Sequence, residues 1–351
     1  MTKLFADKLR QVDPYVPGEQ SKNKNIIKLN ANENPYPPSP KALEAIKNVT
    51  ELNKYPNSSA SELVEALEEY YGVEKGQVFV GNGSDDVLAL CYMSFFNSKK
   101  PILFPDITYS FYPVWCQLFN TPYKTKAVTE DFVIDPKDYY EENGGVIIPN
   151  PNAPTGISQG KEFIKDILDH NKDAIVIIDE AYVDFGAYSA IELLKEYDNL
   201  VVVQTFSKSR SLAGMRIGTA IASKELIGVL NAVKNCYNSY ALDSVAIAAG
   251  TAAVKDDKYF RDCLEKVINT REKFTKEMRE LGFTVYPSHS NFVFATKDDV
   301  NAKDLFEALR EENIFIRYFN LPRINNHLRI TIGTDEQMEI LLEHIKKYLN
   351  K

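Results

Sequence analysis

A run of four apolar residues, 200–203, leads directly into a polar stretch that contains Lys208. The run has the length and composition of a buried strand, so Lys208 is expected just past the strand's carboxyl end. Open α/β sheets bind their ligands at this edge. A lysine among hydroxyls, with Arg216 nearby, suits an amine that forms a Schiff base with a phosphate-bearing carbonyl cofactor. The alternative is an ordinary surface lysine.

A second apolar run, 174–178, ends in Asp179 and, three residues later, Tyr182. A carboxylate at the end of a buried strand needs a cation or several hydrogen bonds, because burying a bare charge is costly. A protonated pyridine nitrogen would be such a cation, whereas a helix cap or an ordinary ion pair is the alternative. The separation of 208 − 179 = 29 residues allows one crossover between neighbouring parallel strands.

Two turns follow other apolar runs. After residues 145–148, prolines at 149, 151 and 154 fix a rigid turn that presents Asn152, either for a cofactor oxygen or for a local Asx hydrogen bond. After residues 78–80, a glycine turn opens a helix, where free N–H groups favour an anion. Because acidic side chains do not suit a phosphate, the expected donors are the backbone N–H groups of Ser84 and Asp85, with Thr205, Ser207 and Arg216.

Composition excludes several classes of protein. A net charge of −8 without a basic run argues against a nucleic-acid partner. Apolar runs are too short to span a membrane, and the first eight residues meet charge too early for a secretory signal. The four cysteines and four histidines are scattered, which predicts reduced thiols, no metal site and a cytoplasmic location.

Taken together, these motifs resemble the fold-type I pyridoxal-phosphate aminotransferases, and in detail their histidinol-phosphate branch. The resemblance covers nearly the whole chain. The matching segments are Leu9-Arg10, Pro14-Tyr15, residues 29–35, 54–56 and 81–85, Pro105-Asp106 with Tyr109, residues 150–156, 179–182, 205–218 and 327–334.

The resemblance implies an α/β fold, with a large domain built on a mostly parallel sheet flanked by helices and a smaller α+β domain. The length of 351 residues also favours two domains over one. We expect an amino-terminal arm over residues 1–35, a large cofactor-binding domain over 36–250 and a small domain over 251–351. A long polar helix pattern over residues 262–281 links the two domains.

The same resemblance implies roles for particular residues around pyridoxal 5'-phosphate. Lys208 would hold the cofactor and shuttle the proton, and Asp179 would keep the ring nitrogen protonated. Tyr182 would donate to the phenolate oxygen and Tyr109 would stack on the ring. Tyr55 would reach the phosphate from a neighbouring subunit, which implies a homodimer with shared active sites. The usual second asparagine of the proline turn is Ala153, so only Asn152 can supply an amide.

Arg329 matches the arginine that holds a substrate carboxylate in this family. The implied substrates are L-histidinol phosphate and 2-oxoglutarate or glutamate, so Arg329 would bind a carboxylate in one half-reaction and a phosphate in the other. A dianion favours a second cation. Arg317 is the candidate, against a plain surface ion pair, and Arg323 is less favoured. Tyr15 and Asn32 complete the expected substrate side.

Three alternatives remain open. An aromatic amino-acid aminotransferase would use Arg329 for a carboxylate alone. A threonine-phosphate decarboxylase would break a different bond at the same site. A regulator that senses an effector would need a DNA-binding segment, for which the chain has no spare length.

Overall fold

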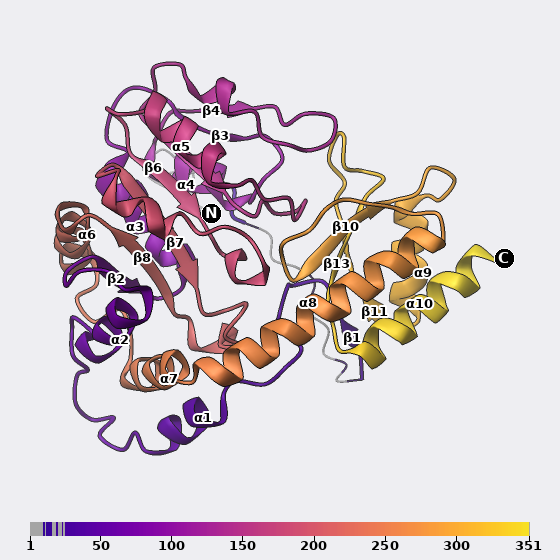
Figure 1. The fold of residues 1–351 in the computed structure, drawn as a ribbon, viewed down its shortest axis with the longest axis horizontal. Helices are drawn as coiled ribbons and strands as arrows, with labels where there is room; N and C mark the ends of the chain where they lie inside the picture. Colours follow the sequence, from indigo (N-terminus) through magenta and orange to yellow (C-terminus); the bar gives the residue numbers. More distant parts are fainter. Residues whose placement is uncertain (1–9, 11, 16–18, 20–22, 24, 351) are drawn as a thin grey trace, which may run out of the picture.

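The computed structural model describes residues 10, 12–15, 19, 23 and 25–350; the first eight residues and Leu9 lie outside this part. A large sheet and a small sheet lie side by side, each with its own helices (Figure 1). A third, two-stranded ladder joins β1 (Ile27–Lys28) to β11 (Ile314–Phe315) in parallel. The segment that was expected to form an arm thus pairs, in part, with the carboxyl-terminal region.

The large sheet has seven strands in the order β2-β8-β7-β6-β5-β3-β4. β8 runs antiparallel to both of its neighbours, while the pairs from β7 to β4 are parallel, so the prediction of a mostly parallel sheet is confirmed. The bounds are β2 Val78–Gly81, β3 Ile102–Pro105, β4 Tyr123–Lys126, β5 Gly145–Pro149, β6 Val176–Asp179, β7 Leu200–Thr205 and β8 Gly218–Ala222.

The central strands are apolar except at their carboxyl ends, because helices cover both faces of the sheet. Ile147, Ile177 and Val201 pack into one core, and the next residue of each strand packs into the core on the opposite face. The first core involves α3 (Ser84–Phe95), α4 (Phe111–Phe119) and α6 (Lys224–Tyr237); the second involves α2 (Ser61–Tyr71), α5 (Lys161–His170) and α7 (Ser244–Lys255).

The small sheet is antiparallel, with the order β12-β13-β10-β9, and has a separate core that includes Leu29. The predicted division of the chain at residues 35 and 250 stays a prediction. The bounds are β9 Thr284–Val285, β10 Phe292–Thr296, β12 Arg317–Tyr318 and β13 Leu328–Thr331, with α9 Ala302–Glu311 and α10 Asp335–Leu349.

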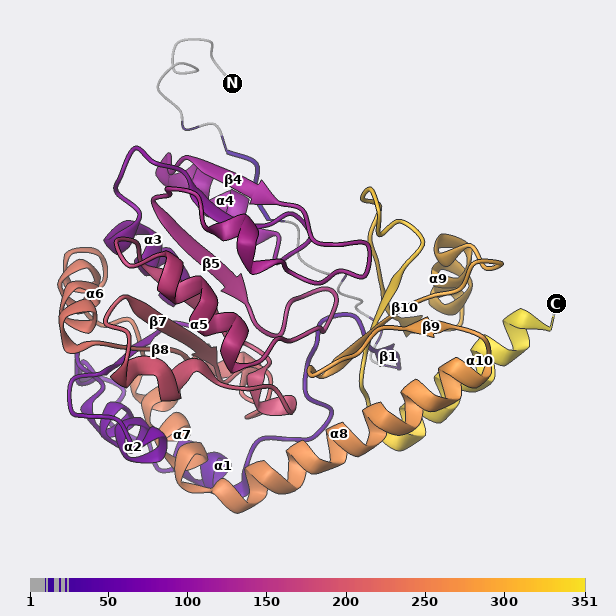
Figure 2. The same cartoon turned by 45° about the horizontal axis from the view of Figure 1, so that its top comes forward.

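Helix α8 (Asp257–Glu280) connects the two regions, as its polar helical pattern predicts. It starts beside α7, which packs on α1 (Pro40–Lys47), and runs to the small sheet and α10 (Figures 1 and 2). Gly72 ends α2 with a φ of 63°, a left-handed conformation that favours glycine.

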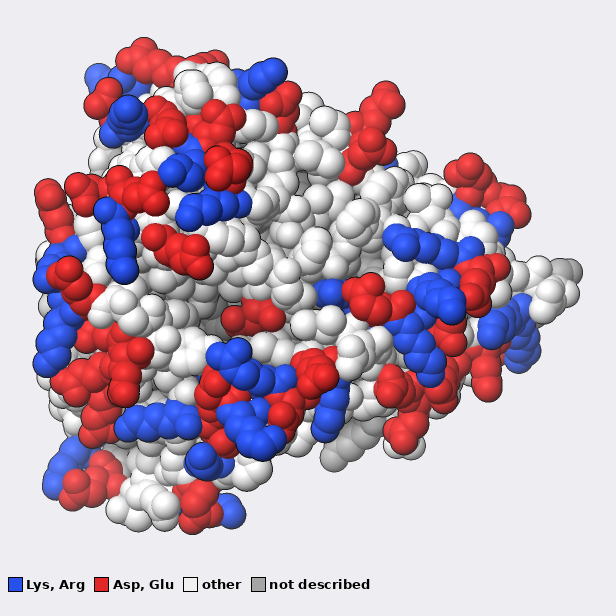
Figure 3. All heavy atoms as spheres, in the orientation of Figure 1, with Lys and Arg blue, Asp and Glu red and all other residues white. Residues whose placement is uncertain are grey.

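The carboxyl ends of β5, β6 and β7 meet at one edge of the large sheet. Pro149 pairs with Asp179, and Asp179 pairs with Val203, so Asp179 lies close to the segment that carries Lys208. In the described part of the chain, no helix is both long and apolar enough to cross a membrane. Acidic and basic side chains are interspersed over the face drawn in Figure 3.

Candidate active site

Two adjoining cavities lie at this edge of the sheet. The Lys208 cavity has a volume of about 110 Å³ and the Arg329 cavity about 260 Å³; Tyr109, Tyr182 and Lys208 line both. The predicted residues in the Lys208 cavity are Ser84, Asp85, Tyr109, Asp179, Tyr182, Thr205, Ser207, Lys208 and Arg216. Those in the Arg329 cavity are Tyr15, Asn32, Tyr109, Tyr182, Lys208, Arg317 and Arg329.

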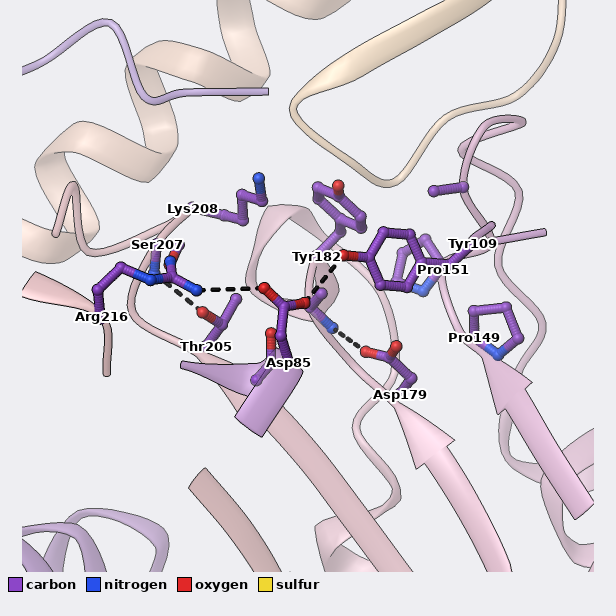
Figure 4. Close-up of a pocket in the computed structure, with 13 residues that line it drawn as sticks. Asp85, Tyr109, Pro149, Pro151, Asp179, Tyr182, Thr205, Ser207, Lys208 and Arg216 are labelled. Atoms are coloured by element: carbon purple, nitrogen blue, oxygen red, sulfur yellow. Dashed lines mark hydrogen bonds and ion pairs between the residues drawn. The ribbon is translucent and has the colours of Figure 1, made fainter. Parts of the chain in front are cut away.

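Lys208 lies just beyond the end of β7, as predicted, and lines both cavities. Its Nζ donates to the Ala31 carbonyl at 3.3 Å and lies 5.8 Å from the centre of the Tyr182 ring (Figure 4). The Asn34 amide fixes the backbone beneath it by donating to the carbonyl of Lys208 at 3.1 Å. No carboxylate of the described residues forms an ion pair with this lysine. Its amine therefore remains available to a carbonyl group.

Asp179 ends β6 as a buried carboxylate. Its Oδ2 accepts a hydrogen bond from the Tyr112 hydroxyl at 2.7 Å, and its Oδ1 accepts one from the Ala181 N–H at 3.2 Å. The described residues place no cation within ion-pair distance of it. Burial therefore raises the pKa of Asp179 to about 6, although both hydrogen bonds oppose the rise. A protonated ring nitrogen in the cavity would supply the missing cation.

The start of α3 forms the opposite wall of the Lys208 cavity. Its first N–H groups lack partners within the helix. Figure 4 shows the Asp85 carboxylate between Arg216, at 3.2 Å, and the Tyr109 hydroxyl, at 2.9 Å. Arg216 also donates to the Ser207 hydroxyl at 3.3 Å.

Close backbone packing shapes this end of the cavity. Gly83 has a φ of 90°, which favours glycine, and a Cβ there would lie 2.5 Å from the Arg216 guanidinium, which would have to shift. A Cβ on Gly218 would lie 2.3 Å from the Ser84 nitrogen. This arrangement of backbone N–H groups, hydroxyls and one guanidinium fits a phosphate. The residues present therefore fit pyridoxal 5'-phosphate at both its ring nitrogen and its phosphate.

The Arg329 cavity contains two arginines from adjacent strands. Arg317 and Arg329 are Cα partners between β12 and β13. Arg329 donates to the Asn30 carbonyl at 3.0 Å, whereas its Nε is buried and has no partner in the described part of the chain. Burial lowers the pKa of Arg329, and the nearby Arg317 lowers it further. Two such cations suit an anionic ligand.

The sequence model of the family "Aminotransferase class I and II" matches residues 24–345. The chain belongs to this family. The observation confirms the resemblance to aminotransferases, and with it the prediction of an enzyme that uses pyridoxal phosphate.

Full-length relatives are closely similar to this aminotransferase. A histidinol-phosphate aminotransferase of Clostridium botulinum strain Okra is 50% identical over 353 residues, covering 100% of both chains. One from Acinetobacter baumannii strain SDF is 52% identical, covering 98% of this chain and 97% of its own length.

Solved structures share the fold. The histidinol-phosphate aminotransferase of Clostridium acetobutylicum superimposes with a TM-score of 0.85 at 25% identity, over 93% of this chain and 99% of that one. The enzyme of Sinorhizobium meliloti, solved in complex with pyridoxal 5'-phosphate, gives a TM-score of 0.83 at 24% identity, over 92% of this chain and 91% of that one.

Three candidate residues of the aminotransferase lie outside both cavities. Asn152 donates its amide to the Ile107 carbonyl at 2.9 Å, while its Oδ1 is buried without a partner in the described part of the chain. Tyr55 is 81% exposed and stacks on Tyr240 with ring centres 4.6 Å apart. Arg323 donates to the carbonyls of residues 128 and 129. The predicted roles of Asn152 and Tyr55 stay predictions.

Sequence reasoning missed two polar contacts of the site. Tyr112 donates to Asp179, and Asn34 holds the backbone of Lys208. Tyr112 lies in the first turn of α4, three residues after Tyr109, and no local pattern in the sequence connects it with Asp179. Asn34 belongs to segment 29–35, which carries part of the family resemblance, but nothing in the sequence connects it with Lys208.

Proposed function

We propose that this aminotransferase moves the amino group of L-histidinol phosphate to 2-oxoglutarate, in histidine biosynthesis. The full-length relatives at about 50% identity carry this name. The structural observation that carries the proposal is the pair of guanidinium groups, from Arg317 and Arg329, in a cavity that Lys208 also lines. One cation suffices for a carboxylate, whereas a phosphate dianion is matched better by two.

Pyridoxal 5'-phosphate, when bound, supplies an electron sink for the reaction. We assign its ring nitrogen to Asp179, whose buried carboxylate faces the cavity, and its ring face to Tyr109. The phosphate is assigned to the N–H groups of Ser84 and Asp85. The remaining contacts are assigned to Thr205, Ser207 and Arg216 at the phosphate, and to Tyr182 and Asn152 at the phenolate oxygen.

Lys208 is assigned both attachment of the cofactor and proton transfer. Its Nζ lies where the two cavities meet, so the amine reaches the reacting carbon from the cofactor side. With the cofactor in place, the Lys208 Nζ would be the group that accepts the proton from the substrate carbon and donates it again. The nearby Tyr182 ring restricts the positions that the Lys208 side chain can take.

The substrate roles divide between the two arginines. Arg329 binds the carboxylate of glutamate in one half-reaction and the phosphate of histidinol phosphate in the other, together with Arg317. Tyr15 and Asn32 line the same cavity. The Asn32 amide donates to the Tyr182 hydroxyl at 2.8 Å, which connects the substrate side to the cofactor side.

We further propose a cytoplasmic homodimer in which Tyr55 reaches the cofactor phosphate of the partner subunit. The exposure of Tyr55 within its own chain supports this, because a large aromatic ring in water is a candidate for an interface. Residues 1–35, 36–250 and 251–351 remain the proposed arm, large domain and small domain.

An assay of glutamate formation tests the proposal, with histidinol phosphate, phenylalanine and threonine phosphate as parallel amino donors. We expect the highest kcat/KM with histidinol phosphate and no carbon dioxide from threonine phosphate. Preference for phenylalanine would favour the aromatic aminotransferase, and release of carbon dioxide without glutamate would favour the decarboxylase.

A further inference from the structure

Tyr112 contacts the side chain on which the cofactor ring nitrogen is proposed to depend. Its hydroxyl donates to the Asp179 Oδ2 at 2.7 Å, and both residues are buried. Tyr112 lines neither cavity, whereas Asp179 lines the Lys208 cavity. Tyr112 can therefore affect the reaction only through its neighbours, and Asp179 is the one to which its hydroxyl is hydrogen-bonded.

The ring of Tyr112 is fixed on several sides. It meets Phe104 edge to face, with ring centres 5.6 Å apart, and Tyr109 in the same way at 5.8 Å. The ring of Trp115 lies on a further side, with ring centres 6.3 Å apart. A fully buried ring in this setting cannot swing away without opening the core, so its hydroxyl holds the carboxylate in one orientation.

The surroundings of Asp179 raise its pKa, and the hydrogen bond from Tyr112 opposes that rise. Desolvation raises the pKa of Asp179, and the bond from Tyr112 is the largest effect that lowers it. On α3, Asp85 raises it further, while Cys91 and Tyr92 stay neutral because burial raises their own pKa values. Tyr112 also stays protonated, because burial raises its pKa well above the usual value. Its hydroxyl therefore remains a donor to the carboxylate over the working pH range.

We propose that Tyr112 is a positioning residue that keeps the Asp179 carboxylate ionised and aimed at the cofactor ring nitrogen. The inference rests on the proposed function only in so far as that function places pyridoxal phosphate in the Lys208 cavity. Tyr109, which precedes α4, lines the cavity, and Tyr112, in the first turn of α4, supports Asp179, which lines the same cavity.

Tyr112→Phe tests the proposal, with Tyr92→Phe as the matched control. Both changes remove one buried hydroxyl from the same core, but only the first removes a donor to Asp179. Binding of pyridoxal phosphate to the cofactor-free protein can be followed through Trp115, the single tryptophan, whose ring centre lies 6.3 Å from that of Tyr109. This readout is independent of turnover.

For Tyr112→Phe we expect cofactor affinity and kcat each to fall by about ten- to a hundredfold, the usual effect of losing a hydrogen bond to a charged group. KM should change little, and the acid limb of the kcat profile should move to higher pH. Tyr92→Phe should lower the melting temperature but leave the affinity and the pH profile at their original values. Equal cofactor affinities in the two variants would overturn the proposal.

A double-variant comparison covers the case in which Tyr112→Phe is merely unstable. If Tyr112 acts through Asp179, adding Tyr112→Phe to Asp179→Asn should lower kcat by less than twofold, as expected for two residues that share one function. A further full-sized loss would overturn the proposal. Failure of the proposed function would appear differently, because the unmodified protein would then form no glutamate from histidinol phosphate while the affinity difference between the variants persisted.

Discussion

Arg317 and Arg329 are Cα partners across the antiparallel strands β12 and β13, and both line the cavity that Lys208 borders. Both guanidinium groups lie near the ring of Phe319, Arg317 at 5.5 Å and Arg329 at 5.6 Å from its centre, and Arg329 also lies 5.3 Å from the centre of Phe292. Two like charges this close repel each other unless an anion lies between them. We therefore expect the pair to favour a doubly charged ligand over a singly charged one.

Arg317→Ala should lower kcat/KM with histidinol phosphate far more than with glutamate. A hydrogen bond to a charged group contributes roughly 1.5–3 kcal/mol, or about one to two powers of ten in kcat/KM. Steady-state kinetics of both half-reactions measure the two losses. Arg323→Ala is the control, because that guanidinium binds loop carbonyls outside the cavity. Equal losses for both substrates, or none, would remove Arg317 from the phosphate site.

Borohydride should attach the cofactor to Lys208 permanently. The purified protein should absorb visible light, and reduction should bleach this absorbance and leave one modified lysine in a peptide map. Lys28 provides an internal control because it lines the Arg329 cavity but pairs with Glu33 at 2.7 Å. An adduct on Lys28, or on any lysine other than Lys208, would contradict the assignment.

Asp179→Asn should stabilise the cofactor-free protein at neutral pH. The pKa of Asp179 is raised to about 6, above its value in an unfolded chain. Between the pKa of the unfolded chain and the folded-state pKa, Asp179 keeps a proton in the folded state that it has lost in the unfolded state. The free energy of unfolding therefore falls as pH rises through this range. The decrease in the free energy of unfolding reaches its full size above pH 6 and is at most about 3 kcal/mol.

Melting temperatures of the cofactor-free proteins at pH 4 and pH 8 measure this effect. The variant should melt higher than the parent at pH 8 and at nearly the same temperature at pH 4. Asp198→Asn, at an exposed position, should show no such difference. The Asp179 variant should also lose most of its transaminase rate, and near-normal turnover would mean that another group keeps the ring nitrogen protonated.

Mixing two inactive variants tests the shared active site. If Tyr55 serves the partner subunit, Lys208→Ala mixed with Tyr55→Phe should form some dimers with one intact site, and activity should rise above that of either parent. Lys208→Ala mixed with Asp179→Ala should not recover, because both residues line the same cavity of one chain. No recovery with Tyr55→Phe, despite proven subunit exchange, would place Tyr55 outside the site.

The sequence predicted those residues of the site that lie at or just beyond the carboxyl ends of strands. Lys208, Asp179 and the turn at Ser84 each follow an apolar strand, and a mostly parallel sheet brings such ends to one edge. The contact of Tyr112 with Asp179 depends on how α4 packs against the sheet, which no local pattern encodes. The Asn152 amide was likewise unpredictable, because its acceptor is the carbonyl of Ile107, 45 residues away.

The 24 residues of α8 form one uninterrupted helix from α7 to the small sheet. At 1.5 Å per residue it is about 36 Å long, so a tilt of about 5° at one end displaces the other by about 3 Å. The strands that carry Arg317 and Arg329 belong to the sheet at the far end. A small change in the angle of α8 near α7 would therefore change how far the two guanidinium groups extend toward a ligand.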